Sequence, residues 1–397
     1  MKYEQTMYVL LRKEKMLTTL SVSGYRSIRD LTVSLDRLNV VTGGNGSGKS
    51  NLYRALRLLA SISQGNLFSI LANEGGFHSA LWAGPEQFSR AMKAGDAPIQ
   101  KTVRKEPVSL RLGFSSEDYG YAIDLGHPMP SRTEFTLDPE IKAEAAWVGQ
   151  VLRPSTTVAI RKGPLVQKVD FGNTENVMSN IDPFDSMMSQ AVSPQAFPIL
   201  AELRARMRSW RFYDHFRTDH AAPARQSQIG TRTPVLSDDG ADLAAALQTI
   251  IEIGDVHALQ ETVHDAFPEH RIEVISENGR FEVAMHQRGL LRSLRASELS
   301  DGTLRYLLLA AALLTPRPPE LMVLNEPETS LHVDLLPSLA RLIVRASQNT
   351  QIIVISHSSA LVNHLRKAEA TCFTLRKDLG ETHLDSNDKP RWAWPKR

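Results

Sequence analysis

The sequence contains a single cysteine, Cys372, among its 397 residues, and it lacks long apolar runs. A lone thiol cannot form an intrachain disulfide, and it excludes the zinc modules that need several cysteines. The longest apolar runs, such as Leu307–Leu314, fall far short of the about 20 residues that cross a bilayer. A secretory signal is also missing, because the short apolar stretch Tyr8–Leu11 is followed at once by basic residues. These absences predict a cytoplasmic protein of a reducing compartment with no membrane partner.

An excess of one charge is missing too, because 46 Lys and Arg residues stand against 44 Asp and Glu residues for a net charge of +2. This balance excludes a histone-like polycation, although it leaves room for a local basic patch. With 42% hydrophobic and 23% charged residues, the composition is typical of a globular protein rather than a disordered one. At about 150 residues per domain, the length predicts two or three domains.

The first part of the chain predicts a β-hairpin followed by a strand, a loop and a helix. Residues 1–15 look like an appendage, and Met16 offers an alternative start. Apolar residues alternate with polar ones on both sides of a predicted turn at Gly24–Asp30, as in an antiparallel hairpin. A β-type run at Leu38–Thr42 then leads into a glycine cluster and a helical pattern over residues 50–62.

The rest of the chain predicts an insert and then a parallel sheet. Residues 96–239 are rich in proline, glycine and serine and suggest several short strands, so we expect an inserted, mostly β lobe that acts as a lid or docking surface. Residues 240–397 are expected to rejoin residues 1–95 in the main domain. Within them, the apolar strands Leu321–Leu324 and Gln351–Ser356 flank an amphipathic helix, which is typical of a βαβ unit in a mainly parallel sheet.

The glycine cluster carries the most specific motif. Residues 43–50 read Gly-Gly-Asn-Gly-Ser-Gly-Lys-Ser, which matches the pattern G-x-x-x-x-G-K-S between a strand and a helix. Such glycines let backbone N–H groups turn inward around phosphate oxygens at the positive end of the helix. Lys49 is expected to reach the β- and γ-phosphates of a nucleotide, and the Ser50 hydroxyl to ligate Mg²⁺. A glycine-rich turn without a ligand is the alternative, but the strand and helix on either side favour phosphate binding.

Polar residues follow the two apolar strands of the predicted βαβ unit. Glu326 is expected at the carboxyl edge of the sheet, where open parallel sheets bind ligands, and could act as general base for the water that attacks the γ-phosphate. His357 follows the next strand and could approach the same phosphate. The alternatives are a structural surface acid at Glu326 and a solvated loop histidine at His357.

Asn325 stands where a P-loop ATPase usually has the acid that holds Mg²⁺. The amide keeps one acceptor oxygen but loses the negative charge, whereas Mg²⁺ prefers anionic oxygen ligands or retained waters. The residue therefore puts the metal affinity in question and makes a slow ATPase the expectation.

Three further features carry weaker signals. The turn Leu299–Thr303 opens an apolar helix, which is an anion-binding geometry, although Ser300 or Asp301 could serve only as the helix cap. The aromatic and polar cluster Trp210–His220 could be a γ-phosphate sensor or a metal site, or a packed corner with a solvated tip. Trp392 and Trp394 indicate a docked terminus.

Taken together and in this order, the motifs resemble those of ABC-type ATPase heads of the RecF/SMC class. The glycine loop matches the Walker A motif, and Leu299–Thr303 resembles the LSGGQ-type signature. Leu321–Glu326 resembles the Walker B motif, Glu328–His332 resembles the D-loop, and His357 resembles the switch histidine. Gly24-Tyr25-Arg26-Ser27 resembles the F-R-S turn of such heads, and Asn-Glu-Pro-Glu-Thr-Ser-Leu-His is similar to RecF-like bacterial ATPases of the AAA type. The resemblance covers about Leu17–Ile62 and Ala241–Leu375.

The resemblance implies a P-loop NTPase of the α/β class that uses ATP and Mg²⁺, with Glu326 and His357 as catalytic residues. The implied nucleotide contacts are Arg26, Gly43, Asn45, Gly46, Gly48, Lys49, Ser50, Asn51, Ser300 and Gly302. Ser50 and Asn325 are the implied metal ligands. Because the signature serine of this class binds the ATP held by the other subunit, the resemblance also implies an ATP-dependent homodimer.

The implied role is action on DNA, or with a DNA-acting partner, in repair, recombination or defence against foreign DNA. Arg54 and Arg57 beside the loop are compatible with DNA, although such charges are usually a solvated helix face. A nucleotide-gated regulator of a separate nuclease or toxin is an alternative that Asn325 keeps open. A transporter nucleotide-binding subunit is less favoured, because of the long insert and the Glu-Pro-Glu run.

Overall fold

The computed structural model describes residues 16–98, 105–129, 134–170, 173–191, 193, 195, 197–385 and 390–397. It divides the chain into two compact units. The first comprises the described residues up to Asp36, Gly43–Trp210 and Phe373–Arg397, and the second comprises Arg37–Thr42 and Arg211–Cys372. The expected boundaries after residues 95 and 239 do not coincide with this division. Residues 1–15, expected as an appendage, lie outside the described residues.

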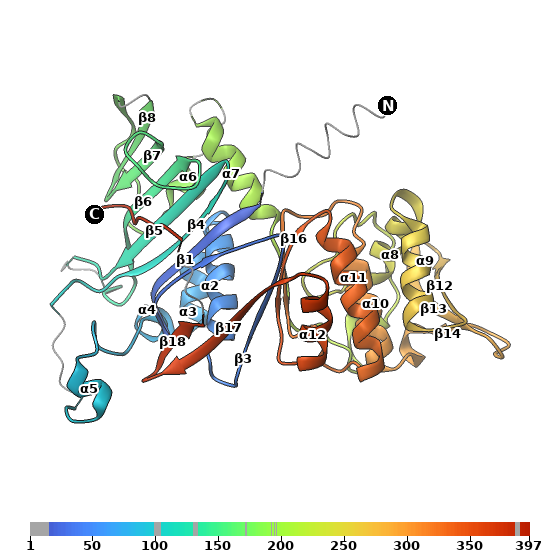
Figure 1. Cartoon of the computed structure of the whole chain (residues 1–397). Coiled ribbons are helices and arrows are strands. Elements are labelled where there is room, and N and C mark those ends of the chain that lie inside the picture. Colours follow the sequence, from blue (N-terminus) through green and yellow to red (C-terminus); the bar gives the residue numbers. More distant parts are fainter. Residues whose placement is uncertain are drawn as a thin grey trace. The chain divides into compact units, whose positions relative to one another are not determined.

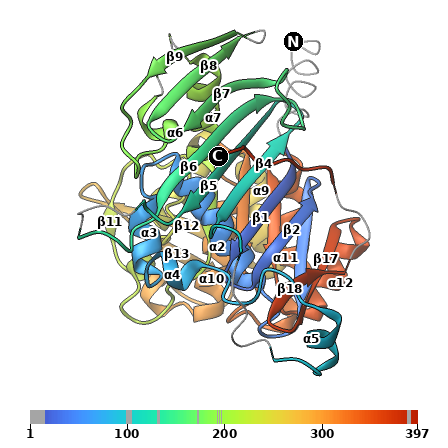
Figure 2. The ribbon, with the colours of Figure 1, turned by 90° about the vertical axis from the view of Figure 1, so that its left-hand side faces the viewer.

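The first unit is built on an eight-stranded antiparallel sheet in the order β2-β1-β4-β5-β6-β7-β8-β9 (Figure 2). Its strands are β1 (Leu17–Tyr25), β2 (Ile28–Ser34), β4 (Leu110–Ser116), β5 (Tyr119–Gly126), β6 (Glu140–Val148), β7 (Thr157–Lys162), β8 (Leu165–Asp170) and β9 (Asn173–Met178). The predicted N-terminal hairpin is confirmed, but its turn is tighter than Gly24–Asp30, because Tyr25 pairs directly with Ile28.

Strands β4 to β9 fall in the segment that the sequence predicts as an insert. They continue the sheet of β1 and β2, since Val22 of β1 pairs with Leu112 of β4, and do not form a sheet of their own. Strand β6 carries a charged residue, Glu144, inside an otherwise largely apolar pattern. That carboxylate is fully buried and pairs with Arg161 at 3.1 Å, which explains why a charge can stand inside this strand.

Six helices among the described residues and a C-terminal hairpin complete the first unit. They are α2 (Lys49–Ile62), α3 (Leu67–Asn73), α4 (Gly76–Ala80), α5 (Arg90–Ala94), α6 (Met187–Gln190), α7 (Pro198–Ser209), β17 (Thr371–Asp378) and β18 (Glu381–Leu384). The predicted docking of the C-terminal tryptophans is confirmed. The Trp392 ring centroid lies 5.6 Å from that of Trp147, and Arg397 pairs with Asp124 at 2.8 Å.

The second unit contains the parallel sheet that the βαβ pattern predicts. The helices of this unit are labelled in Figure 1. Its strands follow the order β10-β15-β16-β3, all parallel. Their bounds are β3 (Leu38–Gly43), β10 (Arg211–Tyr213), β15 (Leu321–Asn325) and β16 (Gln351–Ile355). The helices are α8 (Leu243–Ile253), α9 (Val256–Ala266), α10 (Asp301–Leu313), α11 (Leu336–Ser347) and α12 (Ser359–Lys367). Short 3₁₀ turns occupy Pro223–Arg225, Ala296–Glu298 and Val333–Leu335.

Strand β15, helix α11 and strand β16 form the predicted βαβ unit. Val323 of β15 pairs with Ile353 of β16, and both strands are buried, so each reads as a continuous apolar run. Helix α11 begins with a proline in its first turn and turns an apolar face, including Leu339 and Ile343, into the core. The fold is therefore the α/β class with a mainly parallel sheet that the sequence predicts.

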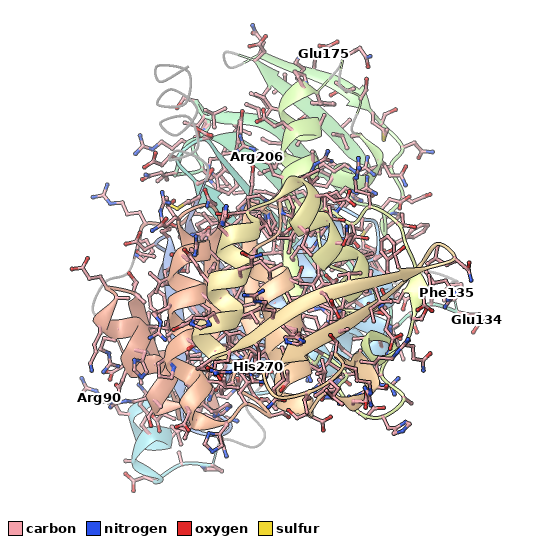
Figure 3. All side chains as sticks on the ribbon, turned by 90° about the vertical axis from the view of Figure 1, so that its right-hand side faces the viewer. Arg90, Glu134, Phe135, Glu175, Arg206 and His270 are labelled. Atoms are coloured by element: carbon pink, nitrogen blue, oxygen red, sulfur yellow. The ribbon has the colours of Figure 1, made fainter. Side chains whose placement is uncertain are left out.

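A smaller antiparallel sheet was not expected from the sequence. It contains β11 (Gln228–Ile229), β12 (His270–Glu277), β13 (Arg280–Gln287) and β14 (Leu294–Arg295). Figure 3 shows the β12–β13 hairpin, with His270 at the start of β12. No helix in the described part of the chain is long and apolar enough to span a membrane.

Candidate active site

The glycine loop follows β3 and adopts backbone conformations that other residues rarely reach. Gly43 has a φ of 150° and Gly48 a φ of 108°. A Cβ atom at Gly43 would lie 2.4 Å from the Leu375 carbonyl oxygen, and one at Gly48 would lie 2.1 Å from Thr382 Oγ1. Glycine is therefore required at both positions by the close approach of the β17–β18 hairpin.

The loop ends in the first turn of α2. Two sources of positive charge lie there, the Lys49 ammonium group and the N-terminal end of the helix dipole. Lys49 is only 3% exposed, and its Nζ donates to the Gly43 and Gly44 carbonyl oxygens at 2.6 and 2.9 Å. Gly48 caps the helix, and the first turn holds no acidic residue, so the positive end of the helix dipole faces the loop unopposed. The arrangement fits an anion with several oxygens, as the motif predicts.

A chain of hydrogen bonds ties the loop to the turn between β1 and β2. Asn51 Nδ2 donates to Ser27 Oγ at 2.7 Å, and Ser27 Oγ and Thr382 Oγ1 lie 2.7 Å apart. Thr382 Oγ1 also donates to the Ser47 carbonyl at 3.0 Å. Arg26, in the same turn, pairs with Glu74 at 2.9 Å. The direct nucleotide contacts expected of Arg26 and Asn51 stay predictions.

The catalytic candidates lie at the carboxyl edge of the parallel sheet. In register, Asn325 at the end of β15 pairs with Ile355 at the end of β16, and Ile355 pairs with Val41 of β3. Glu326 and His357 therefore follow neighbouring strands at one edge of the sheet. The glycine loop begins at this edge as well, because its backbone is continuous with β3.

Glu326 and His357 meet directly. His357 Nε2 lies 3.1 Å from Glu326 Oε1, and both side chains are about two-fifths exposed, at 38% and 42%. Glu326 has a φ of 48°, a conformation that non-glycine residues seldom adopt outside special sites, and its N–H donates to the Ile355 carbonyl at 2.8 Å. The bond holds the strained turn against β16. The pair can bind a water and accept its proton.

Glu328 is a supporting residue whose contacts the sequence analysis did not identify. Its Oε1 accepts hydrogen bonds from Ser356 Oγ at 2.7 Å, from the His357 N–H at 2.8 Å and from the Ser358 N–H at 3.0 Å. One carboxylate thus satisfies the turn that follows β16 and fixes the backbone that carries His357. The Glu-Pro-Glu spacing was the available signal, because it puts a second carboxylate close to the strand end.

Asn325 has a carboxylate as its neighbour. Its Nδ2 donates to Asp214 Oδ1 at 2.7 Å, and its Oδ1 is buried without a hydrogen-bond partner among the described residues. Arg305 of α10 lies nearby and is only 2% exposed. It donates to the carbonyl oxygens of Phe216, Asp214 and Glu326, each at 3.3 Å. Burial lowers the pKa of Arg305, and the negative charges of Asp214, Glu328 and Glu326 act in the opposite direction.

The signature-like turn caps α10. Ser300 Oγ accepts from the Thr303 N–H at 3.1 Å, so Ser300 caps the helix, and the residue is exposed. A Cβ at Gly302 would lie 3.0 Å from the Ser330 carbonyl oxygen, so the segment that resembles a D-loop lies against this turn. Arg225 pairs with Asp301, the residue that follows Ser300, at 2.6 Å. Contact of Ser300 and Gly302 with a nucleotide stays a prediction.

The aromatic and polar cluster Trp210–His220 matches the alternative of a packed corner with a solvated tip. Phe212, Tyr213 and Phe216 are buried, whereas Arg217 and Asp219 form an exposed ion pair at 2.8 Å. The hydrogen bond from Arg217 lowers the pKa of Asp219 to about 2. The corner is therefore packed and its tip is solvated, but Asp214, between them, faces Asn325.

The described residues contain no group of three or more His, Cys, Asp or Glu side chains that could hold a metal ion. Mg²⁺ is usually bound through one or two carboxylates together with phosphate oxygens and waters, not by an all-protein cage. An acceptor oxygen at Asn325 beside the Asp214 carboxylate fits such a site.

Comparison with known proteins identifies a family. Residues 38–363 match the family described as "AAA domain, putative AbiEii toxin, Type IV TA system". A protein of Helicobacter pylori named ATP/GTP phosphatase is 20% identical over 361 residues, which cover 88% of this chain and 87% of that protein. The family match confirms the resemblance to P-loop ATPases of the AAA type.

Solved structures of SMC heads are also similar to this chain. The SMC head bound to the C-winged helix domain of ScpA matches with a TM-score of 0.48 and 14% identity, over 93% of this chain and 96% of that one. The SMC head domain from Thermotoga maritima matches with a TM-score of 0.42 and 14% identity, over 94% of this chain and 99% of that one.

Proposed function

This chain belongs to the AAA-domain family matched by residues 38–363, and on that premise we propose that it binds ATP with Mg²⁺ and hydrolyses it to ADP and phosphate. The observation that carries the proposal is the Glu326–His357 pair at the sheet edge from which the glycine loop starts. The Helicobacter pylori relative supports nucleotide hydrolysis by its name, ATP/GTP phosphatase, which makes GTP a competing substrate.

Binding follows from the loop. The backbone N–H groups of the loop and the positive end of α2 would hold the phosphate oxygens, with Asn45, Gly46, Gly48 and Ser50 in contact with the nucleotide. Lys49 would exchange the Gly43 and Gly44 carbonyl oxygens for the β- and γ-phosphates, because charged oxygens are the stronger hydrogen-bond acceptors.

Hydrolysis follows from the carboxylate and the imidazole. Glu326 would take a proton from a water, whose oxygen forms a bond to the γ-phosphorus as the bond to the bridging oxygen breaks and ADP leaves. His357, held beside Glu326 by its 3.1 Å contact, would orient that carboxylate and bind the γ-phosphate. When bound, Mg²⁺ supplies charge neutralisation at the phosphate oxygens, with Ser50 and Asn325 as the proposed protein ligands.

Lys49→Ala tests the proposal at its binding step. We expect the wild-type chain to bind ATP in calorimetry and to release phosphate, and Lys49→Ala to lose at least about tenfold in ATP affinity, or about 1.4 kcal/mol. Lys367→Ala, which removes an exposed lysine at the end of α12, is the matched control and should leave both measurements unchanged. Folded wild-type protein that takes up neither ATP nor GTP would contradict the proposal.

We also propose that ATP drives two copies together and that the dimer acts on DNA or with a DNA-acting partner in repair, recombination or defence. Support comes from Ser300, which is exposed at the start of α10, where a second copy could bring its nucleotide. The test is the mass of the Glu326→Gln variant in solution, with and without ATP and DNA. Ser300→Arg should abolish an ATP-dependent dimer while ATP binding persists.

A nucleotide-gated regulator of a separate nuclease or toxin is the second candidate. The family description, which names a toxin of a toxin–antitoxin system, and the neutral Asn325 side chain both favour it. A wild-type chain that binds ATP and dimerises but releases no phosphate over several hours would support the regulator. Steady phosphate release that Glu326→Gln abolishes would support the ATPase.

A further inference from the structure

The position of Asp214 is set by the parallel sheet. Strand β10 runs beside β15, with Tyr213 paired to Leu324, so the next residues, Asp214 and Asn325, lie side by side where both strands end. The two residues are 111 positions apart in the sequence, and their side chains are joined by a hydrogen bond of 2.7 Å. Strand pairing thus brings Asp214 beside Asn325, the proposed metal ligand.

The hydrogen bond also determines how the Asn325 amide is oriented. A carboxylate only accepts hydrogen bonds, so Nδ2 must face Asp214 and Oδ1 must face away from it. That Oδ1 atom is buried and accepts no hydrogen bond from the described residues. Buried acceptors are rarely left unsatisfied, and a lone pair held in this way suits a cation or one of its bound waters.

The Asp214 carboxylate is not neutralised by an ion pair in the described parts of the chain. Within the described parts of the chain, Asn325 Nδ2 is its only hydrogen-bond partner and no ion pair involves it. The nearby guanidinium of Arg305 donates to the Asp214 carbonyl oxygen at 3.3 Å and not to its carboxylate. Asp214 is also half-buried, so its charge is less screened than that of an exposed residue.

We propose that Asp214 supplies the anionic ligand, direct or through a bound water, for the divalent cation that accompanies the nucleotide, with Asn325 as its neutral partner. The negative charge that a P-loop ATPase usually has at the position of Asn325 is thus supplied by Asp214, at the end of the neighbouring strand β10. The inference rests on the proposed nucleotide binding. On this assignment, Asn325 no longer implies weak metal binding or a slow ATPase.

The test measures metal affinity instead of activity. Mn²⁺ is titrated against the full chain with a non-hydrolysable ATP analogue, and free Mn²⁺ is followed by electron paramagnetic resonance. Asp214→Asn should weaken Mn²⁺ binding by about tenfold or more, while its amide oxygen still accepts from Asn325 and preserves the local fold. Asp219→Asn is the matched control, because it changes an exposed aspartate in the same segment, and it should bind Mn²⁺ like the wild type.

An exchange variant separates charge from structure. Asp214→Asn combined with Asn325→Asp moves the carboxylate to the other strand and should restore Mn²⁺ affinity to within about threefold, or about 0.7 kcal/mol. Unchanged Mn²⁺ affinity in Asp214→Asn would overturn the inference, as would a folded exchange variant that binds Mn²⁺ no better than Asp214→Asn. A fluorescent ATP analogue titrated in EDTA identifies the other failure, because a wild-type chain that does not bind it contradicts the proposed function itself.

Discussion

His357 Nε2 lies 3.1 Å from Glu326 Oε1, and the two residues follow parallel neighbouring strands. The contact joins a proton acceptor to the group that can orient it. Because the backbone at Glu326 is strained and is bonded to the end of β16, the position of the carboxylate depends on the sheet and not on a flexible loop.

Glu326→Gln should abolish most hydrolysis and spare binding. The amide keeps the shape of the side chain but cannot take a proton, so phosphate release should fall by about 10²- to 10⁴-fold. Affinity for a fluorescent ATP analogue should stay within about twofold. Glu273→Gln, an exposed change on β12, is the control. Equal phosphate release by Glu326→Gln and wild type would remove Glu326 from the role of base.

Glu328→Ala tests whether this residue positions His357. The change leaves three donors, on Ser356, His357 and Ser358, without their common acceptor, so the free energy of unfolding should fall by about 1–3 kcal/mol. Phosphate release should fall as well. Glu328→Gln, whose amide oxygen can still accept, should recover most of both quantities. Phosphate release by Glu328→Ala at the wild-type rate would show that the turn after β16 holds His357 in place without the Glu328 carboxylate.

The sequence predicts the features whose signals are local. The loop at residues 43–50, the β15–α11–β16 unit and the strand-end position of Glu326 each follow from a continuous stretch of chain. The contact of Asn325 with Asp214 could not be predicted in this way, because β10 has only three residues and pairs with a strand more than a hundred positions later. Arg305 reads as a polar interruption of an apolar helix, and only the packed structure shows the carbonyl groups it binds.

The division into units also depends on contacts between distant segments, which the sequence does not reveal. The proline- and glycine-rich composition of residues 96–239 suggests a separate lobe, but hydrogen bonding between β1 and β4 joins these strands to the N-terminal hairpin. Strand pairing between distant segments decides membership of a sheet, and composition carries no record of it.

Gly48→Ala should destabilise the loop even without nucleotide. Its φ of 108° disfavours any side chain, and the new methyl group would lie 2.1 Å from Thr382 Oγ1. We expect a loss of about 1–3 kcal/mol in the free energy of unfolding. Gly44→Ala is the matched control in the same loop, because a Cβ there meets nothing within 4 Å. Chemical denaturation of the two variants in nucleotide-free buffer compares them, and equal stabilities would contradict the steric argument.

Asn325→Asp should behave as a like-charge variant. The new carboxylate would replace the amide that donates to Asp214 at 2.7 Å, so a hydrogen bond becomes a repulsive contact. We expect a lower melting temperature in EDTA and a larger rise on addition of Mg²⁺ with nucleotide than the wild type shows. Thermal denaturation under the two conditions measures both effects. Stability in EDTA equal to that of the wild type would show that the two side chains separate without cost.

Arg305→Lys should loosen the connection between α10 and the two strand ends that precede Glu326 and Asp214. The guanidinium reaches the carbonyl oxygens of both residues and of Phe216, whereas the single nitrogen of a lysine cannot bond to all three in this geometry. We expect the free energy of unfolding to fall by about 1–3 kcal/mol.

Circular dichroism during urea denaturation is the appropriate measurement for Arg305→Lys, because it reports on the helices of this unit, whereas the five tryptophans all belong to the other unit. Arg366→Lys, on the exposed face of α12, is the matched control. Since Arg305 also fixes the carbonyl of Glu326, phosphate release should fall in Arg305→Lys while ATP affinity holds. A stable variant with normal phosphate release would mean that the strand ends keep their positions without this guanidinium.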